Sequence, residues 1–216
     1  MILSRKSLAI TAVAALGLMA SACSVLKTPD PIQTYRFGAV PAFDAAAQAQ
    51  TGACQPIVIA LRRIEFVDAA RGDRLLSVTG SETAYIGGAR WVSQAETLFQ
   101  SSLENAFADG APCLRLAPGA FARDSLVLSV DVRRFETVYA SAGAVPQVRF
   151  SVNASLIQPG DRSVVAERRF EVTEGADANR VSAIVAAYEA VNAEAVRQVV
   201  QWTATTAPQV YQPRQN

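Results

Sequence analysis

The sequence contains no histidine, and this absence removes more chemistry than any other feature of its composition. Ser-His-Asp and Cys-His catalysis, the metalloprotease helix and most zinc sites all require an imidazole. The only lysines are Lys6 and Lys27, so Schiff-base and Ser-Lys mechanisms would depend on a residue near the N-terminus. Neither a phosphate-binding loop ending in Gly-Lys-Ser/Thr nor a Cys-x-x-Cys motif occurs. The sequence therefore predicts no cofactor and no metal.

The enzyme class that these absences leave open is a hydrolase with paired carboxylates. The acids fall in predicted turns, on the polar faces of predicted strands and on outer helix faces: Asp73, Asp161, Asp131, Glu171, Glu104 and Glu189. Solvated surface charges are the more usual explanation of such a distribution. We therefore predict that the protein is not an enzyme.

The N-terminus has the pattern of a lipoprotein signal. Arg5 and Lys6 precede an apolar run over residues 8–20, and small residues then lead to Cys23. A cysteine at this boundary predicts thioether attachment of diacylglycerol and cleavage that releases residues 1–22. The alternatives are an ordinary cleaved signal with a chance cysteine and a transmembrane anchor. The run is shorter than the about 20 apolar residues that a spanning helix needs.

The mature chain has the size of one domain and nearly balanced charge. Two of the 20 basic residues lie in the signal, which leaves 18 against 19 acidic residues and no basic stripe for nucleic acid. Half of the whole sequence is apolar, so a sizeable core can form. We divide the chain into a signal peptide (1–22), a lipidated tether (23–33), one domain (34–205) and a flexible tail (206–216).

The two remaining cysteines, Cys54 and Cys113, are candidates for a disulfide. An exported chain meets an oxidising compartment, where a single pair of cysteines usually bridges. Two free, buried thiols are the alternative. The bridge would close a loop of about 60 residues and contribute on the order of 3–4 kcal/mol on the chain-entropy model.

The first half of the domain alternates short apolar segments with turns. Strands are predicted over 34–37, 56–61, 75–79 and 83–86, and residues 41–55 form a predicted loop. Ser93-Gln94-Ala95-Glu96 has the form of a capping box that begins a helix. Gly110 and Pro112 end this helix.

The second half predicts a three-stranded meander and a long helix. Apolar residues alternate over 126–132, 148–156 and 164–172, with a phase slip at Arg133-Arg134 that predicts a β-bulge. A continuous apolar stripe follows over about 179–205. The predicted fold is α+β: one domain with an antiparallel-rich sheet and two helices packed on one face.

Arg90-Trp91 and nearby Tyr85 are the candidate partner-binding residues. Contact sites favour Trp and Arg, and this pair lies at a Gly-rich turn just before the first predicted helix. Trp91 as part of the core is the alternative. Two further basic pairs, Arg133-Arg134 and Arg168-Arg169, suggest either cross-strand ion pairs on one sheet face or contacts to lipid phosphate.

The order of these motifs resembles the ABC-type transport auxiliary lipoproteins, of the paraquat-inducible protein C type that works with MCE-domain proteins. The matching residues are Cys23, Tyr35, Arg90-Trp91, Asp131-Val132-Arg133-Arg134-Phe135, Arg168-Arg169-Phe170 and the stripe over 181–202. The resemblance covers most of residues 34–205. The segment 41–55 and the Cys54/Cys113 pair are not part of it.

The resemblance implies a non-enzymatic lipoprotein, anchored by acyl chains such as palmitate on the periplasmic face of the outer membrane. Its partners would be an MCE-domain protein and the associated ABC permease and ATPase, with lipids moving between the two membranes. Ser24, after Cys23, fits outer-membrane sorting, and a homo-oligomer is compatible with this role. The alternative is an accessory of another envelope machine, for lipopolysaccharide or cell-wall synthesis. An enzyme that uses carboxylates is the more distant rival.

Overall fold

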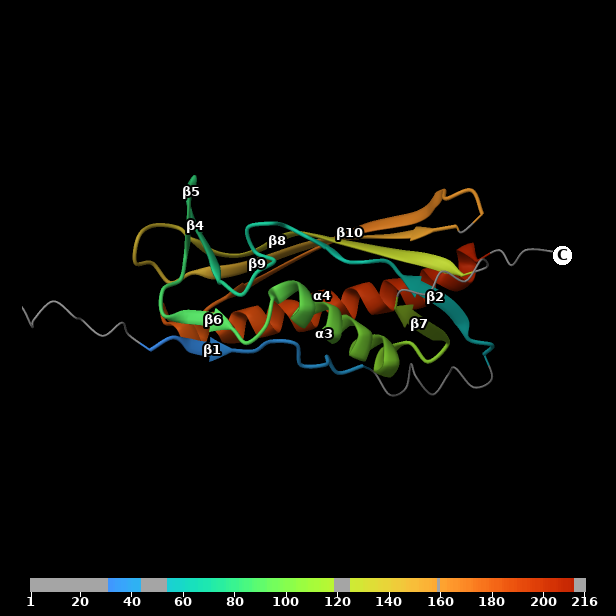
Figure 1. Ribbon diagram of the computed structural model, residues 1–216, viewed down its shortest axis with the longest axis horizontal. Coiled ribbons are helices and arrows are strands. Elements are labelled where there is room, and N and C mark those ends of the chain that lie inside the picture. The colour runs from blue at the N-terminus through green and yellow to red at the C-terminus, as the bar shows by residue number, and fades with distance from the viewer. Residues whose placement is uncertain (1–30, 44–53, 119–124, 159, 212–216) are drawn as a thin grey trace, which may run out of the picture. The chain divides into compact units, whose positions relative to one another are not determined.

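Three consecutive strands form an antiparallel meander at the centre of the fold (Figure 1): β8 (Leu126–Tyr139), β9 (Gln147–Ile157) and β10 (Val164–Gly175). The computed structural model describes residues 31–43, 54–118, 125–158 and 160–211. The meander confirms the strands predicted from alternating apolar residues. The apolar side of β8 and β9 is buried, as expected for a sheet with one face on the core.

The predicted β-bulge is present in β8. The pairing of β8 with β9 shifts register between Val132 and Arg134. The extra residue allows Phe135 to face the core, where it is 2% exposed, although it breaks the even spacing of Leu128, Val130 and Val132.

Three short strands lie in succession along the other edge of β8, and all of them run parallel to it. They are β2 (Ile57–Leu61), β3 (Glu65–Phe66) and β4 (Leu76–Thr79). β2 also pairs in parallel with β7 (Leu114–Pro118), and β4 forms an antiparallel hairpin with β5 (Glu82–Tyr85). The main path of the sheet is therefore β10-β9-β8-β2-β7. The sheet is mixed, and the sequence did not predict its parallel pairings.

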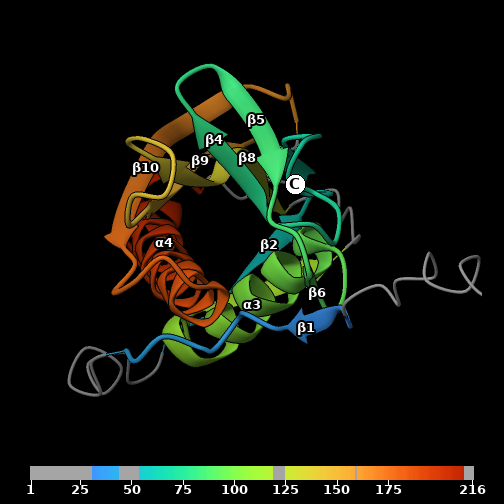
Figure 2. The ribbon, with the colours of Figure 1, turned by 90° about the vertical axis from the view of Figure 1, so that its left-hand side faces the viewer.

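Both helices lie on the same side of this sheet (Figures 1 and 2): α3 (Ala95–Gly110) and α4 (Val181–Val210). α4 contacts β9, β10 and α3, so it buries two adjoining faces. The predicted α+β class with two helices on one face is confirmed. α4 continues to Val210, beyond the predicted end at 205, so the predicted tail at 206–216 begins too early. Pro208 lies in the last turn, where only one backbone hydrogen bond is lost.

The first turn of α3 is stabilised differently from the predicted capping box. Gln94 is the N-cap, and no side chain caps the helix. The backbone N–H groups of Ala95 and Glu96 instead donate to the carbonyl oxygens of Gly72 (2.9 Å) and Arg71 (3.3 Å). A preceding loop supplies the acceptors that a Ser side chain would otherwise provide.

The N-terminal segment of the described domain runs over both helices. β1 (Gln33–Tyr35) pairs in parallel with β6 (Ala89–Trp91), and the chain then crosses α3 and α4. The Glu189 carboxylate accepts from the backbone N–H groups of Gly38 (3.0 Å) and Ala39 (2.6 Å). Gly38 has φ +116 and lies close to α3, a combination that favours glycine.

An aromatic cluster fills the core at the N-terminal half of α4. The ring of Tyr188 lies 4.7 Å from that of Phe135 and 5.1 Å from that of Trp91, measured between centroids. Its hydroxyl accepts from Thr137 Oγ1 (3.1 Å) and donates to the carbonyl oxygen of Leu76 (3.2 Å). Burial raises the pKa of Tyr188 far above its usual value, so the phenol remains neutral.

Candidate functional site

Trp91, one of the predicted partner-binding residues, belongs to the core. It is 3% exposed, and its indole packs edge-on against Phe37 at 4.9 Å and against Tyr188 at 5.1 Å. The expectation that Arg90 and Trp91 are presented together is therefore corrected: the apolar side chain points inward from β6 while its neighbour points outward. The core alternative for Trp91 is the one that the structure shows.

Tyr85 lies on β5 and Arg90 on β6, two strands of different sheets, and each contacts the loop before β4. Arg90 Nη1 contacts both carboxylate oxygens of Asp73 at 3.0 Å. The guanidinium of Arg74 lies 3.6 Å from the centre of the Tyr85 ring, and the Tyr85 hydroxyl donates to the Ala69 carbonyl (3.0 Å). We call Asp73, Arg74, Tyr85 and Arg90 the hairpin patch. Its side chains are held in place and remain partly exposed.

The predicted basic sheet face is mostly neutralised within single strands. Arg133 forms an ion pair with Asp131, and Arg169 does so with Glu171 (3.0 Å). These are pairs within one strand, rather than the predicted cross-strand pairs. Arg168 lies over the ring of Phe170, so it does not share the face of Arg169. The expectation that Arg168 and Arg169 line one sheet face together is therefore wrong.

The acids considered for a hydrolase site have structural partners instead. Besides those paired with arginines, Glu104 accepts from Gln100 and Glu189 holds the segment after β1. The Ser163 backbone N–H and hydroxyl donate to Asp161 and lower the pKa of its carboxyl. Among the described residues no group of three potential metal ligands occurs.

The predicted disulfide joins Cys54 to Cys113, with their Cα atoms 5.7 Å apart. It connects the residues just before β2 to the turn between α3 and β7. The predicted lipidation site Cys23 lies outside the described residues. No helix in the described part of the chain is long and apolar enough to cross a membrane.

A pocket of about 600 Å³ opens beside this disulfide, and sequence reasoning missed it. Its walls come from the ends of both helices and the beginnings of β2 and β7. The apolar lining includes Phe43, Ile57, Ala111, Pro112, Leu114, Ala204 and Pro208, while Gln55, Gln201 and Thr205 are polar. A Cβ at Gly110 would overlap the Phe43 ring, so a larger residue there would displace that side chain. Segments so distant in sequence give no local signal of a shared cavity.

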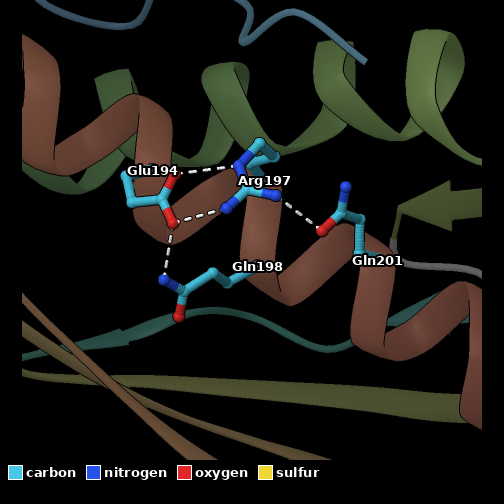
Figure 3. Close-up of polar contacts among 4 residues, drawn as sticks. All are labelled: Glu194, Arg197, Gln198 and Gln201. Atoms are coloured by element: carbon cyan, nitrogen blue, oxygen red, sulfur yellow. Dashed lines mark hydrogen bonds and ion pairs between the residues drawn. The ribbon is translucent and has the colours of Figure 1, made fainter. Parts of the chain in front are cut away.

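A hydrogen-bonded network on α4 ends at Gln201 (Figure 3), an exposed residue that also lines the pocket and marks its mouth. Arg197 donates to both oxygens of Glu194, from Nε at 2.8 Å and from Nη2 at 2.6 Å. Its Nη1 donates to Gln201 Oε1 at 2.7 Å, and Gln198 also donates to Glu194 (2.7 Å). The hydrogen bond from Arg197 lowers the pKa of Glu194, and the same contact raises the pKa of Arg197. The network therefore remains an ion pair and fixes the amide of Gln201.

This arrangement provides two surfaces with different chemistry. The pocket has apolar walls and one oriented amide at its mouth, and the hairpin patch offers exposed polar and aromatic groups. The two regions lie on different elements: the patch on β5, β6 and the loop before β4, and the pocket at the C-terminal ends of α3 and α4.

Comparison with known proteins identifies relatives of the whole domain. Residues 41–200 match the family model of the ABC-type transport auxiliary lipoprotein component. A crystal structure of a protein from Xanthomonas campestris is similar with a TM-score of 0.68 and 24% identity, over 82% of this chain and 98% of that one. The crystal structure of an uncharacterized protein gives 0.59 and 15% identity, with the same coverage of both chains. No curated protein matches this chain.

Proposed function

This chain belongs to the ABC-type transport auxiliary lipoprotein family, and from that premise we propose that it serves an MCE-type ABC system that moves lipids between the inner and outer membranes. The observation that carries the proposal is the family match, which spans the main sheet, α3 and most of α4. The family is an auxiliary transport component and not a known enzyme family. The chain would act through contacts with the transporter.

The proposed anchor is a lipid on Cys23, with the protein on the periplasmic face of the outer membrane. The basic start, the short apolar run and the small residues before Cys23 support it. More than one acyl chain is needed for stable anchoring, since each buried methylene contributes roughly 0.8 kcal/mol. Cys23→Ser should leave the protein unprocessed or in the soluble periplasmic fraction. Processing and membrane binding that persist in this variant would contradict the anchor.

The proposed docking site for the MCE-domain protein is the hairpin patch. Arg90 is the residue to test, because its side chain is partly exposed while its backbone position is fixed by β6. Truncation of a central interface residue typically costs at least ~2 kcal/mol, or about thirtyfold in affinity. Arg90→Ala should therefore weaken partner binding with little change in melting temperature, since exposed ion pairs contribute about 0–1 kcal/mol.

Arg115→Ala on β7 is the matched control, because that arginine is exposed on a different strand. It should leave partner binding unchanged. Equal binding by the Arg90 variant and the control would move the docking site away from the hairpin patch. A large loss of stability on changing Arg90 would show that its pairing with Asp73 is structural.

Affinity purification of the full-length protein from membranes, followed by mass spectrometry, tests the proposed function. We expect an MCE-domain protein, an ABC permease and an ATPase among the captured proteins. Capture of lipopolysaccharide-assembly or cell-wall-synthesis components would instead support the alternative accessory role. In both cases the lipoprotein family assignment would stand, and the transport partner would change.

A homo-oligomer is part of the same proposal. Among the described strands, β10 is the last on one side of the main sheet path, and no other described strand pairs with its outer edge. Light scattering of the purified protein tests this point. A measured mass equal to that of one chain, at protein concentrations like those in the cell envelope, would contradict a homo-oligomer.

A further inference from the structure

We propose that the pocket beside the disulfide binds one acyl chain of a lipid, with the Gln201 amide donating to an ester carbonyl at its mouth. The inference rests on the proposed function and deepens it, because it assigns part of the carried lipid to this chain. The pocket lies between the C-terminal ends of α3 and α4 and the beginnings of β2 and β7.

The size and origin of the pocket support a small-molecule ligand. Its volume of about 600 Å³ falls in the range of roughly 300–1,000 Å³ that is typical of such sites. Small residues contribute to this space: Ala111 follows the last residue of α3, and Ala204 lies on α4. The disulfide holds one wall in place.

The side chains that line the walls favour a ligand whose part inside the pocket is apolar and uncharged. The described residues that line the pocket include no Asp, Glu, Lys or Arg. Enclosing a charged headgroup here would cost several kcal/mol without a compensating partner, whereas methylene groups gain by leaving water. An acyl chain meets this requirement, and a lipid phosphate must remain outside the pocket.

The polar group at the mouth selects a neutral acceptor. Arg197 donates to Gln201 Oε1, so the amide oxygen is already used and the amide nitrogen is turned away from Arg197 (Figure 3). No hydrogen bond to another described residue engages this nitrogen, which leaves it free to donate. The charge of Arg197 is already balanced by Glu194 at 2.6 Å. A neutral ester carbonyl therefore suits this mouth better than a free carboxylate, which would need an uncompensated positive charge.

The test uses the purified mature full-length protein, with its lipid anchor, and vesicles of phosphatidylethanolamine that carry a photoreactive group near the end of one acyl chain. After irradiation, mass spectrometry locates the cross-links. We expect them on residues that line the pocket, such as Phe43, Ile57 and Leu114. Cross-links confined to the outer sheet face or the hairpin patch would overturn the assignment.

Two variants separate binding from folding. Ala204→Phe fills the pocket from α4 and should reduce pocket cross-linking about tenfold or more, while Ala190→Phe places the same ring on an exposed position of α4 and should leave it unchanged. Gln201→Glu keeps the size of the side chain but removes the amide donor. This change should reduce pocket cross-linking about three- to tenfold. Equal cross-linking by the wild type and both pocket variants would overturn the proposal.

Competition identifies the headgroup chemistry. An unlabelled monoacylglycerol should displace the probe at a concentration several-fold lower than the free fatty acid of the same chain length. Preference for the free acid would overturn the ester assignment. If the pocket binds no acyl chain but the transporter co-purifies, only this inference fails. If the pocket binds acyl chains and no transporter co-purifies, the proposed function fails instead.

Discussion

The two ends of α4 carry the same kind of apolar surface, but one end is packed in the core and the other borders a pocket. Around Tyr188, large rings from β8, β6 and the segment after β1 fill the space between helix and sheet. Around Ala204, small side chains leave an open pocket that a disulfide borders. An apolar stripe on a helix therefore indicates burial. The volume of its side chains decides whether the space beside it is a filled core or an open pocket.

The covalent and noncovalent supports of the two ends differ accordingly. The Tyr188 end is held by ring packing and by a buried hydroxyl that has both a donor and an acceptor partner. The Ala204 end has fewer large side chains to hold it, and the Cys54–Cys113 bridge ties its strands and helix together. Removal of each support in turn therefore tests whether the two ends of α4 differ in this way.

The largest effect should come from Phe135→Ala at the filled end. Phe135 is 2% exposed and packs against five other aromatic rings of the described residues. Its truncation should lower the free energy of unfolding by about 3–5 kcal/mol, measured by urea denaturation. Phe43→Ala, at the partly exposed rim of the pocket, should cost clearly less. Equal losses would mean that the pocket end is a core as tightly packed as the other.

Removal of the disulfide should have the next largest effect. Cys54→Ser/Cys113→Ser releases a loop with a sequence separation of 59, and loop-closure entropy predicts a loss of about 4 kcal/mol in the free energy of unfolding. Reductant should destabilise the wild type by a similar amount and have no effect on the double variant. An unchanged denaturation midpoint in reductant would show that side-chain packing supports the pocket end without the bridge.

Tyr188→Phe should have a smaller effect at the filled end. The ring stays, but Thr137 Oγ1 and the Leu76 carbonyl lose their shared partner in a buried place. The expected loss is about 1–3 kcal/mol in the free energy of unfolding. Tyr85→Phe on the exposed hairpin patch is the control and should stay within about 0.5 kcal/mol. An unchanged free energy of unfolding in Tyr188→Phe would indicate that water replaces the hydroxyl.

The same tyrosine should make stability fall at alkaline pH. Burial raises the pKa of Tyr188 above its ordinary value of 10.0, so the unfolded chain loses this proton first. The stabilisation is complete below pH 10 and declines as the pH rises above it. Denaturation midpoints between pH 9 and 11.5 should therefore fall more steeply for the wild type than for Tyr188→Phe. Parallel curves would contradict a neutral, buried phenol.

The smallest effect should come from Glu194 on α4. Hydrogen bonding from Arg197 lowers the pKa of Glu194 below its ordinary value of 4.5. Its contribution is complete above pH 4.5 and is lost as the pH falls through the lower folded value. Glu194→Gln should flatten the acid side of the stability curve slightly, because the pair is partly exposed. Glu104→Gln on α3 serves as the comparison.

The parts of the fold that could be predicted are those encoded by local periodicity. Alternation in β8 and β9 predicted the meander, and the phase slip at Arg133-Arg134 predicted the bulge. The order of β2, β3 and β4 along β8 could not be predicted, because a short apolar run such as Ile57–Leu61 gives neither direction nor neighbour. Pairings between distant segments depend on the whole fold.

The candidate site was harder to predict than the fold. The Cys54–Cys113 pairing follows from counting cysteines, but the pocket beside it depends on the small side chains of Ala111 and Ala204. Trp91 shows the reverse problem. The same residue type serves cores and interfaces, and only the packing against Phe37 and Tyr188 distinguishes the two.

The position of β2 also has a consequence for folding kinetics. Ile57 pairs with Leu114 and Ile59 with Leu126, so both neighbours of β2 leave the ribosome long after β2 itself. Until they arrive, an apolar strand has no partner for its backbone, and such segments are prone to aggregate. Contacts this distant slow folding because a long loop must close first. The Cys54–Cys113 bridge closes the same loop, so an oxidised chain begins each refolding with that entropy already lost.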